Sequence, residues 1–433
     1  MKRIAFKTLG CKVNQYETQA IRERLLEAGF NEVKGPADVY VINTCTVTHR
    51  ADADSRRFIR VARKENPNST IIVTGCYVEL DKEEIQKIAD NLLIIKNSDK
   101  NKILQYLVKD SKQGTARDAI SRFEGRTKAF VKIQDGCDNF CSYCKVPLVR
   151  GRSRSRQPEE VMKEIAALIS NNYKEVVLCG ICLGDWGRDI GLELSSLLRE
   201  IEDGIKGEFR VRLSSIEPWY VTSDLLQTIG DSKRICHHLH IPMQSGDDDI
   251  LGRMNRNFKA ADFLSLINRS RSVMPQVAFT TDILIGFPRE GERHFNNTVN
   301  MVESTRPSRV HIFPFSMRKG TPAELFSEDV IPTEVINERA SRLRAITDRL
   351  AIEYKTQFIG RHLRVLVETE RDKRSGLLTG FTDTYIKTAF QGPDELKGQF
   401  AHLTLTNANS YDILAPHLSR LDTPVISQEY NRV

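Results

Sequence analysis

The chain has 433 residues, of which 40% are apolar and 28% are charged, a composition typical of globular proteins with sizeable cores. At roughly 100–200 residues per domain, this length predicts about two to four domains. The sequence has no run of about 18 apolar residues and no signal peptide at its start, so we expect a cytoplasmic protein without a transmembrane helix. The net charge of +7 permits a nucleic-acid partner but does not imply one.

Nine cysteines are the most informative residues of the sequence. A reducing cytoplasm disfavours disulfides, and an odd number of cysteines fits poorly with complete pairing. We therefore expect free thiols or metal ligands, and the positions of the cysteines along the chain decide between these two possibilities.

Residues 1–112 are predicted to form an α/β domain with a parallel sheet, because strand-like runs alternate with helices. In the first helix, Glu17 stands three residues after Asn14, which predicts a capping box, and Gly29 predicts the end of this helix. The expected strands cover residues 3–10, 39–43 and 70–74, and the second helix covers residues 51–65.

Each of these three strands ends at a cysteine, namely Cys11, Cys45 and Cys76. Ligands bind outside the carboxyl ends of the strands of a parallel sheet. One cysteine in such a place could arise by chance, but three in succession are difficult to explain as core residues. We therefore expect the three thiols to share one site.

A longer series of alternating strands and helices, residues 129–358, follows a polar segment, residues 113–128, that we expect to be a linker. Six strand–helix units fit an open, partial (β/α)6 barrel better than a complete eight-fold barrel. From residue 361 to residue 428 the sequence is rich in β-forming residues and turns, which predicts a small all-β barrel. The expected strands of the central barrel cover residues 129–134, 175–179, 210–214, 238–242, 278–286 and 309–315, and the expected helices include residues 158–171, 192–203, 223–230, 291–304 and 333–358.

The strongest chemical signal is a group of three cysteines, Cys137, Cys141 and Cys144, directly after the first barrel strand. Thiolates are the ligands of iron–sulfur clusters, and three of them leave one iron of a four-iron cluster open to a substrate or cofactor. A zinc site is the alternative, but zinc usually takes four ligands, often as two pairs of cysteines two residues apart. The three-residue gap and the missing fourth ligand favour an iron–sulfur cluster.

This spacing, with an aromatic residue before the last cysteine, resembles the signature of the radical S-adenosylmethionine (SAM) superfamily. The chain resembles one of its families, the methylthiotransferases, over nearly its whole length. The three N-terminal cysteines match the second cluster of that family, and the C-terminal β-rich region resembles its RNA-binding TRAM domain. The matching segments of the barrel are residues 145–156, 213–218, 240–246, 281–288 and 311–316.

The resemblance implies an enzyme with two [4Fe-4S] clusters that uses SAM to add a methylthio group to carbon 2 of an adenosine in tRNA. The cluster on Cys137, Cys141 and Cys144 would bind SAM and generate a 5′-deoxyadenosyl radical, which removes a hydrogen from the base. The cluster on the N-terminal cysteines would carry the sulfur that is methylated and joined to the ring. An unactivated aromatic C–H bond resists polar chemistry, which is why a radical cofactor is needed.

The residues around two of the N-terminal cysteines indicate a branch of the family. Residues 8–18 and 43–48 resemble the branch that modifies N6-threonylcarbamoyladenosine beside the anticodon, giving its 2-methylthio derivative. A sister enzyme acting on N6-isopentenyladenosine or on a ribosomal-protein aspartate is one alternative, and a non-catalytic RNA-binding protein with zinc-stabilised domains is another. The resemblance implies tRNA, an external one-electron donor and a sulfur donor as partners.

Four further residues are candidates for contacts with SAM. Tyr143 lies between two of the expected cluster ligands, and Gly180 follows the second barrel strand. Glu217 and Gln244 stand near strand ends, where they could hold the ribose or the carboxylate. Each of the four could equally be a structural residue at the mouth of the barrel.

A few positions depart from the pattern of the family. Lys145 and Leu148 stand where a small or apolar residue and an aromatic residue are usual. Cys179 and Cys182 form a pair with two-residue spacing, for which a third metal site and thiols lining the barrel are the two interpretations.

Four arginines alternate directly after the cysteine motif, at Arg150, Arg152, Arg154 and Arg156. In an extended segment alternate residues share one face, so these guanidinium groups could neutralise the phosphates of a bound RNA. A solvated loop or internal salt bridges are the alternative. The target base would have to leave its stack to reach a buried cluster.

Overall fold

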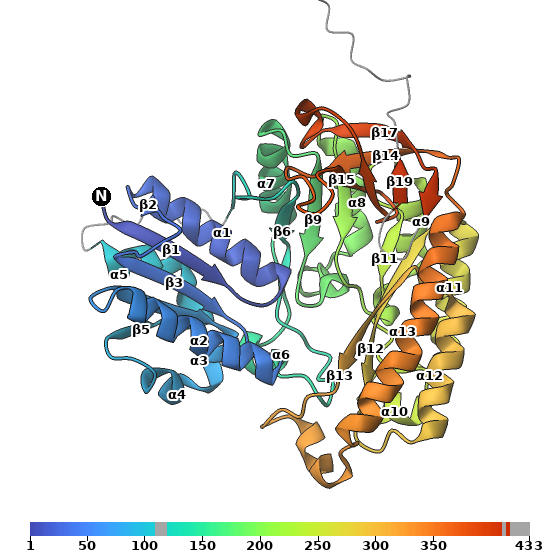
Figure 1. Cartoon of the computed structure of the whole chain (residues 1–433), viewed down its shortest axis with the longest axis horizontal. Helices are drawn as coiled ribbons and strands as arrows, with labels where there is room; N and C mark the ends of the chain where they lie inside the picture. Colours follow the sequence, from blue (N-terminus) through green and yellow to red (C-terminus); the bar gives the residue numbers. More distant parts are fainter. Residues whose placement is uncertain (109–118, 409–412, 416–433) are drawn as a thin grey trace, which may run out of the picture.

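The computed structural model describes residues 1–108, 119–408 and 413–415, which form an N-terminal sheet, a central barrel and a C-terminal sheet (Figure 1). The N-terminal unit (blue) lies beside the barrel (green to orange), and the C-terminal strands (red) lie over one end of the barrel. The predicted domain boundaries lie partly outside these residues and stay a prediction. None of the described helices is long and apolar enough to cross a bilayer.

The N-terminal unit is a parallel sheet between two layers of helices. Its elements are β1 Arg3–Thr8, α1 Lys12–Glu27, β2 Asn31–Glu32, β3 Val39–Thr44, α2 His49–Glu65, β4 Thr70–Gly75, α3 Cys76–Leu80, α4 Lys82–Gln86, β5 Leu92–Ile94, η1 Asn97–Lys102 and α5 Ile103–Leu107. The strand order is β2-β1-β3-β4-β5. Helices α1 and α5 pack on one face, whereas α2, α3 and α4 pack on the other. All residues of β3 and β4 except Thr70 are buried, as expected for a parallel sheet that is covered on both sides.

Helix α1 contributes to two hydrophobic cores. Ile21 and Leu25 pack beneath the N-terminal sheet. Val13, Tyr16 and Ala20 pack instead in the core of the barrel. This shared helix joins the two units and holds the carboxyl edge of the N-terminal sheet against the barrel.

The predicted capping box at the start of this helix is wrong. The helix begins at Lys12 with Cys11 as its N-cap, and the side chains of Asn14 and Glu17 are buried. Asn14 donates to the backbone carbonyls of Leu9 and Thr44 at 2.7 and 3.0 Å, so it joins two strand ends instead of capping a helix.

The central unit is a partial barrel of six parallel strands with helices outside. Its elements are β6 Ala129–Lys132, β7 Gln134–Asp135, α6 Val146–Arg150, β8 Arg154–Ser155, α7 Pro158–Ser170, β9 Glu175–Cys179, η2 Leu183–Asp185, η3 Arg188–Ile190, α8 Leu194–Gly204, β10 Arg210–Leu213, η4 Pro218–Tyr220, α9 Ser223–Asp231, β11 His238–His240, α10 Asp248–Arg253, α11 Ala260–Val273, β12 Ala278–Ile285, α12 Glu292–Thr305, β13 Arg309–Pro314, η5 Pro322–Asp329 and α13 Thr333–Thr356. Strands β6, β9 and β10 pair in one sheet and β11, β12 and β13 in another. Isolated parallel bridges, Val211 with Ile235 and Ser215 with His240, connect the β10 and β11 segments and make the series continuous. The predicted (β/α)6 barrel is therefore confirmed.

The C-terminal unit is a small sheet with its own core, which confirms the predicted all-β fold. Its elements are β14 His362–Val367, β15 Leu378–Thr382, β16 Lys387–Phe390, η6 Asp394–Leu396, β17 Phe400–Thr404, β18 Asn407–Ala408 and β19 Ile413–Ala415. The strand order is β17-β14-β15-β16-β19-β18, and the described pairs are antiparallel apart from β16 with β19. Val365, Leu378 and Phe390 are among its buried core residues.

A buried cluster of charges joins this sheet to the barrel. Glu175 is fully buried and forms ion pairs with Arg210 and Arg212. Arg210 donates to the carbonyl of Phe381 at 2.8 Å, and Arg212 donates to the carbonyl of Asp383 at 2.7 Å. Although burial opposes ionisation, these arginines hold the pKa of Glu175 well below its usual range.

Replacing Glu175 with glutamine should weaken this junction, because Glu175→Gln leaves two buried guanidinium groups without their counter-charge. Removal of one partner from a buried ion pair costs about 3–5 kcal/mol. We expect a lower thermal midpoint and faster tryptic cleavage between the barrel and the C-terminal sheet. Glu200→Gln, at an exposed position on α8, is the matched control and should leave both quantities unchanged. Equal behaviour of the two variants would contradict the structural role of Glu175.

Candidate metal centres and substrate chamber

The three N-terminal cysteines meet at the carboxyl edge of the sheet, as predicted from the strand ends. Cys11 caps α1, Cys45 directly follows β3, and Cys76 is the first residue of α3. Gly10 precedes Cys11 and has a φ of +92°. A side-chain carbon at this position would lie 2.9 Å from the sulfur of Cys45, so only glycine fits here. Burial raises the pKa of Cys45 to about 11, with smaller contributions from the nearby sulfurs of Cys76 and Cys11.

A buried arginine lies beside this first set of cysteines. The Nε of Arg150 is 3.3 Å from the sulfur of Cys76, and its Nη1 donates to Glu17 at 2.6 Å. Arg150 also contacts Asp135 at 3.3 Å, and Glu17 forms further ion pairs with Lys100 and Lys132. Burial disfavours the ionised form of Glu17, but these three cations hold its pKa well below the usual range.

The second set of cysteines lies in a loop between β7 and α6. The backbone N–H of Cys137 donates to Gly151 at 3.1 Å, and that of Cys144 donates to Cys141 at 3.0 Å, so the loop curls back on itself. Burial raises the pKa of Cys144 to about 12. A hydrogen bond from Cys182 lowers the pKa of Cys137.

A second buried arginine, Arg256, lies beside this loop. Its Nη1 is 3.6 Å from the sulfur of Cys141, and it forms an ion pair with Glu217. Arg256 also donates to the carbonyl of Pro242 at 2.9 Å. Its Nε is buried without a hydrogen-bond partner among the described residues. Each set of cysteines therefore has one arginine beside a sulfur, and each arginine is paired with a glutamate.

The spacing of the sulfurs tests whether these sites fit a single ion or a cluster. In a tetrahedral zinc site with Zn–S bonds of about 2.3 Å, the sulfurs lie about 4 Å apart. Among the described residues, neither set of cysteines has its three sulfurs within 4.8 Å of one another. The wider spacing and the all-thiol donor sets fit iron–sulfur clusters, in which each cysteine binds a different iron.

The four residues predicted to contact SAM have different environments in the structure. Tyr143 packs against the small hydrophobic cluster that contains Met254 and Phe287, and burial raises its pKa. A side-chain carbon at Gly180 would lie 2.7 Å from Oε1 of Gln134, so this glycine allows a close packing contact. Gln244 has a φ of +68° and its backbone pairs with β12. Glu217 directly precedes η4 and forms an ion pair with Arg256, which contacts the sulfur of Cys141.

The structure divides the four alternating arginines into two pairs. Arg150 is buried in the network described above, and Arg156 forms an ion pair with the fully buried Glu164 at 2.6 Å. Arg152 and Arg154 are exposed, and the side chain of Arg152 is 75% accessible. The alternation therefore does not give one exposed face, because two of the four side chains fill cation sites inside the protein.

The remaining cysteines do not form a third set. Cys179 is fully buried in the barrel core, while Cys182 lies near Cys137 and accepts a hydrogen bond from Asn139 at 3.4 Å. Cys236 is also a buried core residue.

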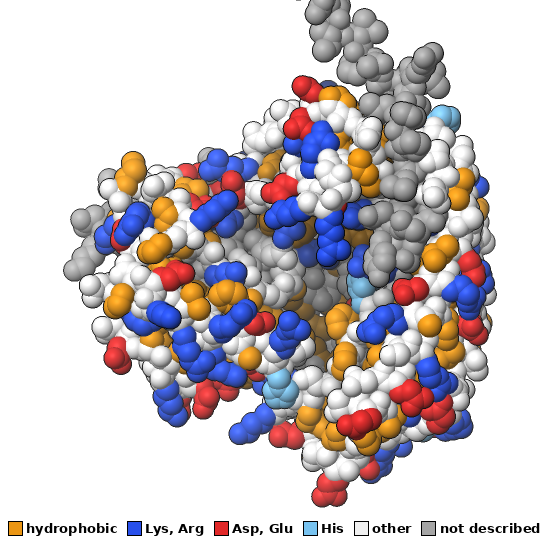
Figure 2. Space-filling model, viewed as in Figure 1, with side chains coloured by type: hydrophobic (Ala, Val, Ile, Leu, Met, Phe, Trp, Pro, Cys, Tyr) orange, Lys and Arg blue, Asp and Glu red, His pale blue; other side chains and the backbone are white. Residues whose placement is uncertain are grey.

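A chamber of about 650 Å³ opens inside the barrel next to Cys11. Its wall includes His240, Asp282 and His311, one from each of β11, β12 and β13. Asp282 lies 3.2 Å from His240 and 3.1 Å from His311. No local pattern in the sequence marks this group, although each member belongs to a segment that resembles the family and lines the chamber from a strand. Figure 2 shows the molecule hollowed between the N-terminal unit and the barrel, with Lys and Arg side chains around the hollow.

Comparison with known proteins agrees with this arrangement. Residues 3–95 match the model of an uncharacterized protein family, UPF0004, and residues 131–302 match that of the radical SAM superfamily. A Bacillus subtilis protein named threonylcarbamoyladenosine tRNA methylthiotransferase MtaB is 38% identical over 427 residues, which cover 94% of each chain. The chain belongs to the radical SAM methylthiotransferase family. A Thermotoga maritima protein of the same name is 37% identical and spans 90% of this chain and 92% of its own.

Relatives with a different printed name are also similar to this chain. A Desulfitobacterium hafniense protein named tRNA-2-methylthio-N(6)-dimethylallyladenosine synthase is 31% identical over 95% of this chain and 96% of its own. Among solved structures, the radical SAM methyltransferase TsrM from Kitasatospora setae has a TM-score of 0.53 at 12% identity, covering 72% of this chain and 73% of its own. That likeness supports the fold assignment.

The Arg150 network predicts a contrast between two neighbouring arginines of this methylthiotransferase. Arg150→Met should destabilise the protein by about 3–5 kcal/mol, because it leaves Glu17 as a buried anion with fewer cations. Arg152→Met, the same substitution at an exposed position, should change stability by less than about 0.5 kcal/mol. Anaerobic urea denaturation followed by circular dichroism measures both. A large effect at Arg152, or none at Arg150, would contradict this assignment.

Proposed function

We propose that this chain is a tRNA methylthiotransferase that adds a methylthio group to carbon 2 of N6-threonylcarbamoyladenosine next to the anticodon. The observation that carries the proposal is the pair of three-thiol sites, one at the edge of the N-terminal sheet and one at the mouth of the barrel. Cys11 of the first set lines the chamber. The higher identity to relatives named for threonylcarbamoyladenosine, 38% against 31% for one named for dimethylallyladenosine, supports the choice of nucleoside.

The proposed cofactors are two [4Fe-4S] clusters and SAM. Cys137, Cys141 and Cys144 would hold the cluster that binds SAM, and Cys11, Cys45 and Cys76 would hold the other. When bound, these groups supply the 5′-deoxyadenosyl radical and the sulfur that becomes the methylthio group. An external electron donor and a sulfur donor complete the proposed reaction, and we expect it to take place in the cytoplasm.

The residues of the chain would orient these groups and keep the site dry. The positive charges of Arg150 and Arg256 oppose the rise that burial causes in the pKa of Cys11 and of Cys141, which favours the thiolate form that a cluster requires. Glu217, held by Arg256, is the proposed contact to the ribose or the carboxylate of SAM, and Gln244 lies on a neighbouring strand end. The hydrophobic packing of Tyr143 gives it a structural role in this proposal.

The proposed domains are an N-terminal cluster domain (1–112), a linker (113–128), the radical SAM barrel (129–358) and an RNA-binding TRAM domain (361–428). The proposed phosphate contacts near the active site are reduced to Arg152 and Arg154, since Arg150 and Arg156 are occupied inside the protein. Both exposed arginines directly follow the loop of the second cysteine set, where an RNA backbone would pass.

The central experiment separates the two sets of cysteines. We expect the anaerobically reconstituted chain to be brown, with about eight irons and eight sulfides, if two four-iron clusters are present. Replacing Cys11, Cys45 and Cys76 together with alanine should halve the iron content and abolish methylthio transfer, while reductive cleavage of SAM persists. Nucleoside mass spectrometry of a modified anticodon stem–loop is the assay. Methylthio transfer by the triple variant would contradict the proposal, and colourless wild-type protein with stoichiometric zinc would favour the non-catalytic alternative.

The exposed arginines give a separate prediction for RNA binding. Arg152→Met and Arg154→Met should each weaken binding of an anticodon stem–loop and lower the slope of log affinity against log salt by about 0.7–0.9, the value expected for one phosphate contact. Fluorescence anisotropy at several salt concentrations measures the slope. Lys206→Met, at an exposed position away from the cysteine loop, is the control. An unchanged slope in both arginine variants would exclude these contacts.

A further inference from the structure

The wall of the chamber has more positive than negative side chains once its ion pairs are counted. Its three carboxylates are all satisfied by neighbours. Glu175 is paired with Arg210 and Arg212, and Glu368 lies 3.4 Å from Lys128. Asp282 is held between two histidines, as described above. The acidic side chains of the wall therefore leave no unpaired negative charge in this space.

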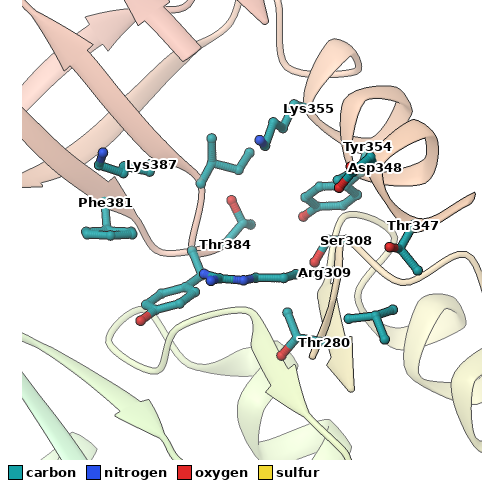
Figure 3. A pocket seen from close by; sticks show the side chains of 14 residues that line it. Thr280, Ser308, Arg309, Thr347, Asp348, Tyr354, Lys355, Phe381, Thr384 and Lys387 are labelled. Carbon is teal, nitrogen blue, oxygen red and sulfur yellow. The ribbon is translucent and has the colours of Figure 1, made fainter. Parts of the chain in front are cut away.

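Two cations of the same wall have no such partner. Lys12 and Arg309 both line the chamber, and within the described part of the chain neither forms an ion pair or a side-chain hydrogen bond. Arg309 also lines an adjoining pocket of about 380 Å³, where Figure 3 shows it between Thr280 and Thr384. Its side chain belongs to β13 and extends toward the C-terminal sheet.

The surroundings of His238 indicate that Lys12 and Arg309 lie near the same part of the chamber wall. Burial lowers the pKa of His238, and the positive charge of Lys12 contributes to the same shift, so Lys12 lies within electrostatic range of this ring. The Nε2 of His238 is 3.0 Å from the hydroxyl of Thr280. Thr280 is the register partner of Arg309 across the β12–β13 pair. Lys12 and Arg309 thus both lie near the His238–Thr280 pair.

Unpartnered polar atoms line the same region. Ser214 is 8% exposed and His238 is 5% exposed, and both line the chamber. The hydroxyl of Ser214 and the Nδ1 of His238 are buried and have no hydrogen-bond partner among the described residues. Buried polar groups are nearly always hydrogen-bonded, so two such atoms beside two unpaired cations point to a polar, anionic ligand.

We propose that Lys12, Arg309, Ser214 and His238 form a subsite for the carboxylate-bearing N6 substituent of the substrate adenosine. This inference rests on the proposed function and identifies the part of the chamber that recognises the N6 substituent. The threonylcarbamoyl group carries one carboxylate, one hydroxyl and a urea-like linkage. Lys12 and Arg309 bind the carboxylate, while Ser214 and His238 hydrogen-bond to the neutral polar atoms.

The same subsite rejects an apolar N6 substituent. A dimethylallyl group would exclude water from both cations and leave the two buried polar atoms unpaired. Sites built to hydrogen-bond a polar substrate discriminate strongly against analogues that lack the polar groups, since the unpaired site atoms then carry the desolvation cost. The chamber volume of about 650 Å³ is within the range of about 300–1,000 Å³ for small-molecule sites.

The test compares the charged substituent with a neutral one of nearly the same shape. The anaerobically reconstituted full-length protein is given anticodon stem–loops that carry either threonylcarbamoyladenosine or its methyl ester. Equilibrium binding is measured by fluorescence anisotropy without SAM, and KM and kcat are measured with SAM. We expect the wild type to bind the acid about 10- to 100-fold more tightly than the ester, the range of one charge-assisted hydrogen bond.

Arg309→Met should remove most of this preference by weakening the acid alone, with the effect in KM more than in kcat. Lys12→Met should act in the same direction, with its iron content checked because Lys12 adjoins Cys11. Ser214→Ala should weaken the acid and the ester alike. Lys206→Met, the matched loss of one exposed positive charge, should keep the wild-type preference.

The outcomes separate the subsite from the proposed function. An unchanged preference in both Arg309→Met and Lys12→Met, or an equal loss for acid and ester in both, overturns the subsite while the function stands. If cluster-loaded wild type modifies the dimethylallyladenosine stem–loop and not the threonylcarbamoyladenosine one, the proposed function fails and the subsite fails with it. Modification of the acid together with loss of the preference in Arg309→Met supports both.

Discussion

The buried guanidinium of Arg150 is the contact on which the arrangement of the two units depends. It lies at the end of α6, and its partners come from three other elements: Glu17 of α1, Asp135 of β7 and Cys76 of α3. A cation with a 1% exposed side chain is stable only if opposite charge surrounds it. The position of Arg150 therefore ties the carboxyl edge of the N-terminal sheet to the loop of the second cysteine set.

The shared helix α1 makes this tie rigid. Because Tyr16 packs in the barrel core while Ile21 packs beneath the N-terminal sheet, the helix cannot rotate without opening one of the two cores. Cys11 at its first turn is thereby held at the chamber, and the close contact of Gly10 with Cys45 brings the next strand end to the same place. Hydrophobic packing thus fixes the position of the first cysteine set, and Arg150 places a positive charge beside it.

Local patterns in the sequence were enough for the fold and for placing Cys11, Cys45 and Cys76 at one edge of the sheet, because strand–helix periodicity and strand-end positions are properties of short segments. They failed where a residue's partner is distant in the chain. Asn14 and Glu17 have the spacing of a capping box, yet Glu17 binds Lys100, which is 83 positions away. Arg156 alternates with exposed arginines but contacts Tyr16, 140 positions away. His240, Asp282 and His311 form one group only after three strands pair.

The two cysteine sets have the same arrangement of charges, although one lies in the N-terminal unit and the other in the barrel. In each, an arginine contacts one sulfur, at 3.3 Å for Cys76 and 3.6 Å for Cys141, and a glutamate binds that arginine. A lone buried thiolate would be costly, and burial alone raises the pKa of Cys141 while Arg256 opposes this rise. The glutamate in turn prevents the arginine from adding a full uncompensated charge. Each set of cysteines therefore has a positive charge beside its sulfurs, and two further cations without an ion pair among the described residues, Lys12 and Arg309, line the chamber, where a charged substrate would supply an anion.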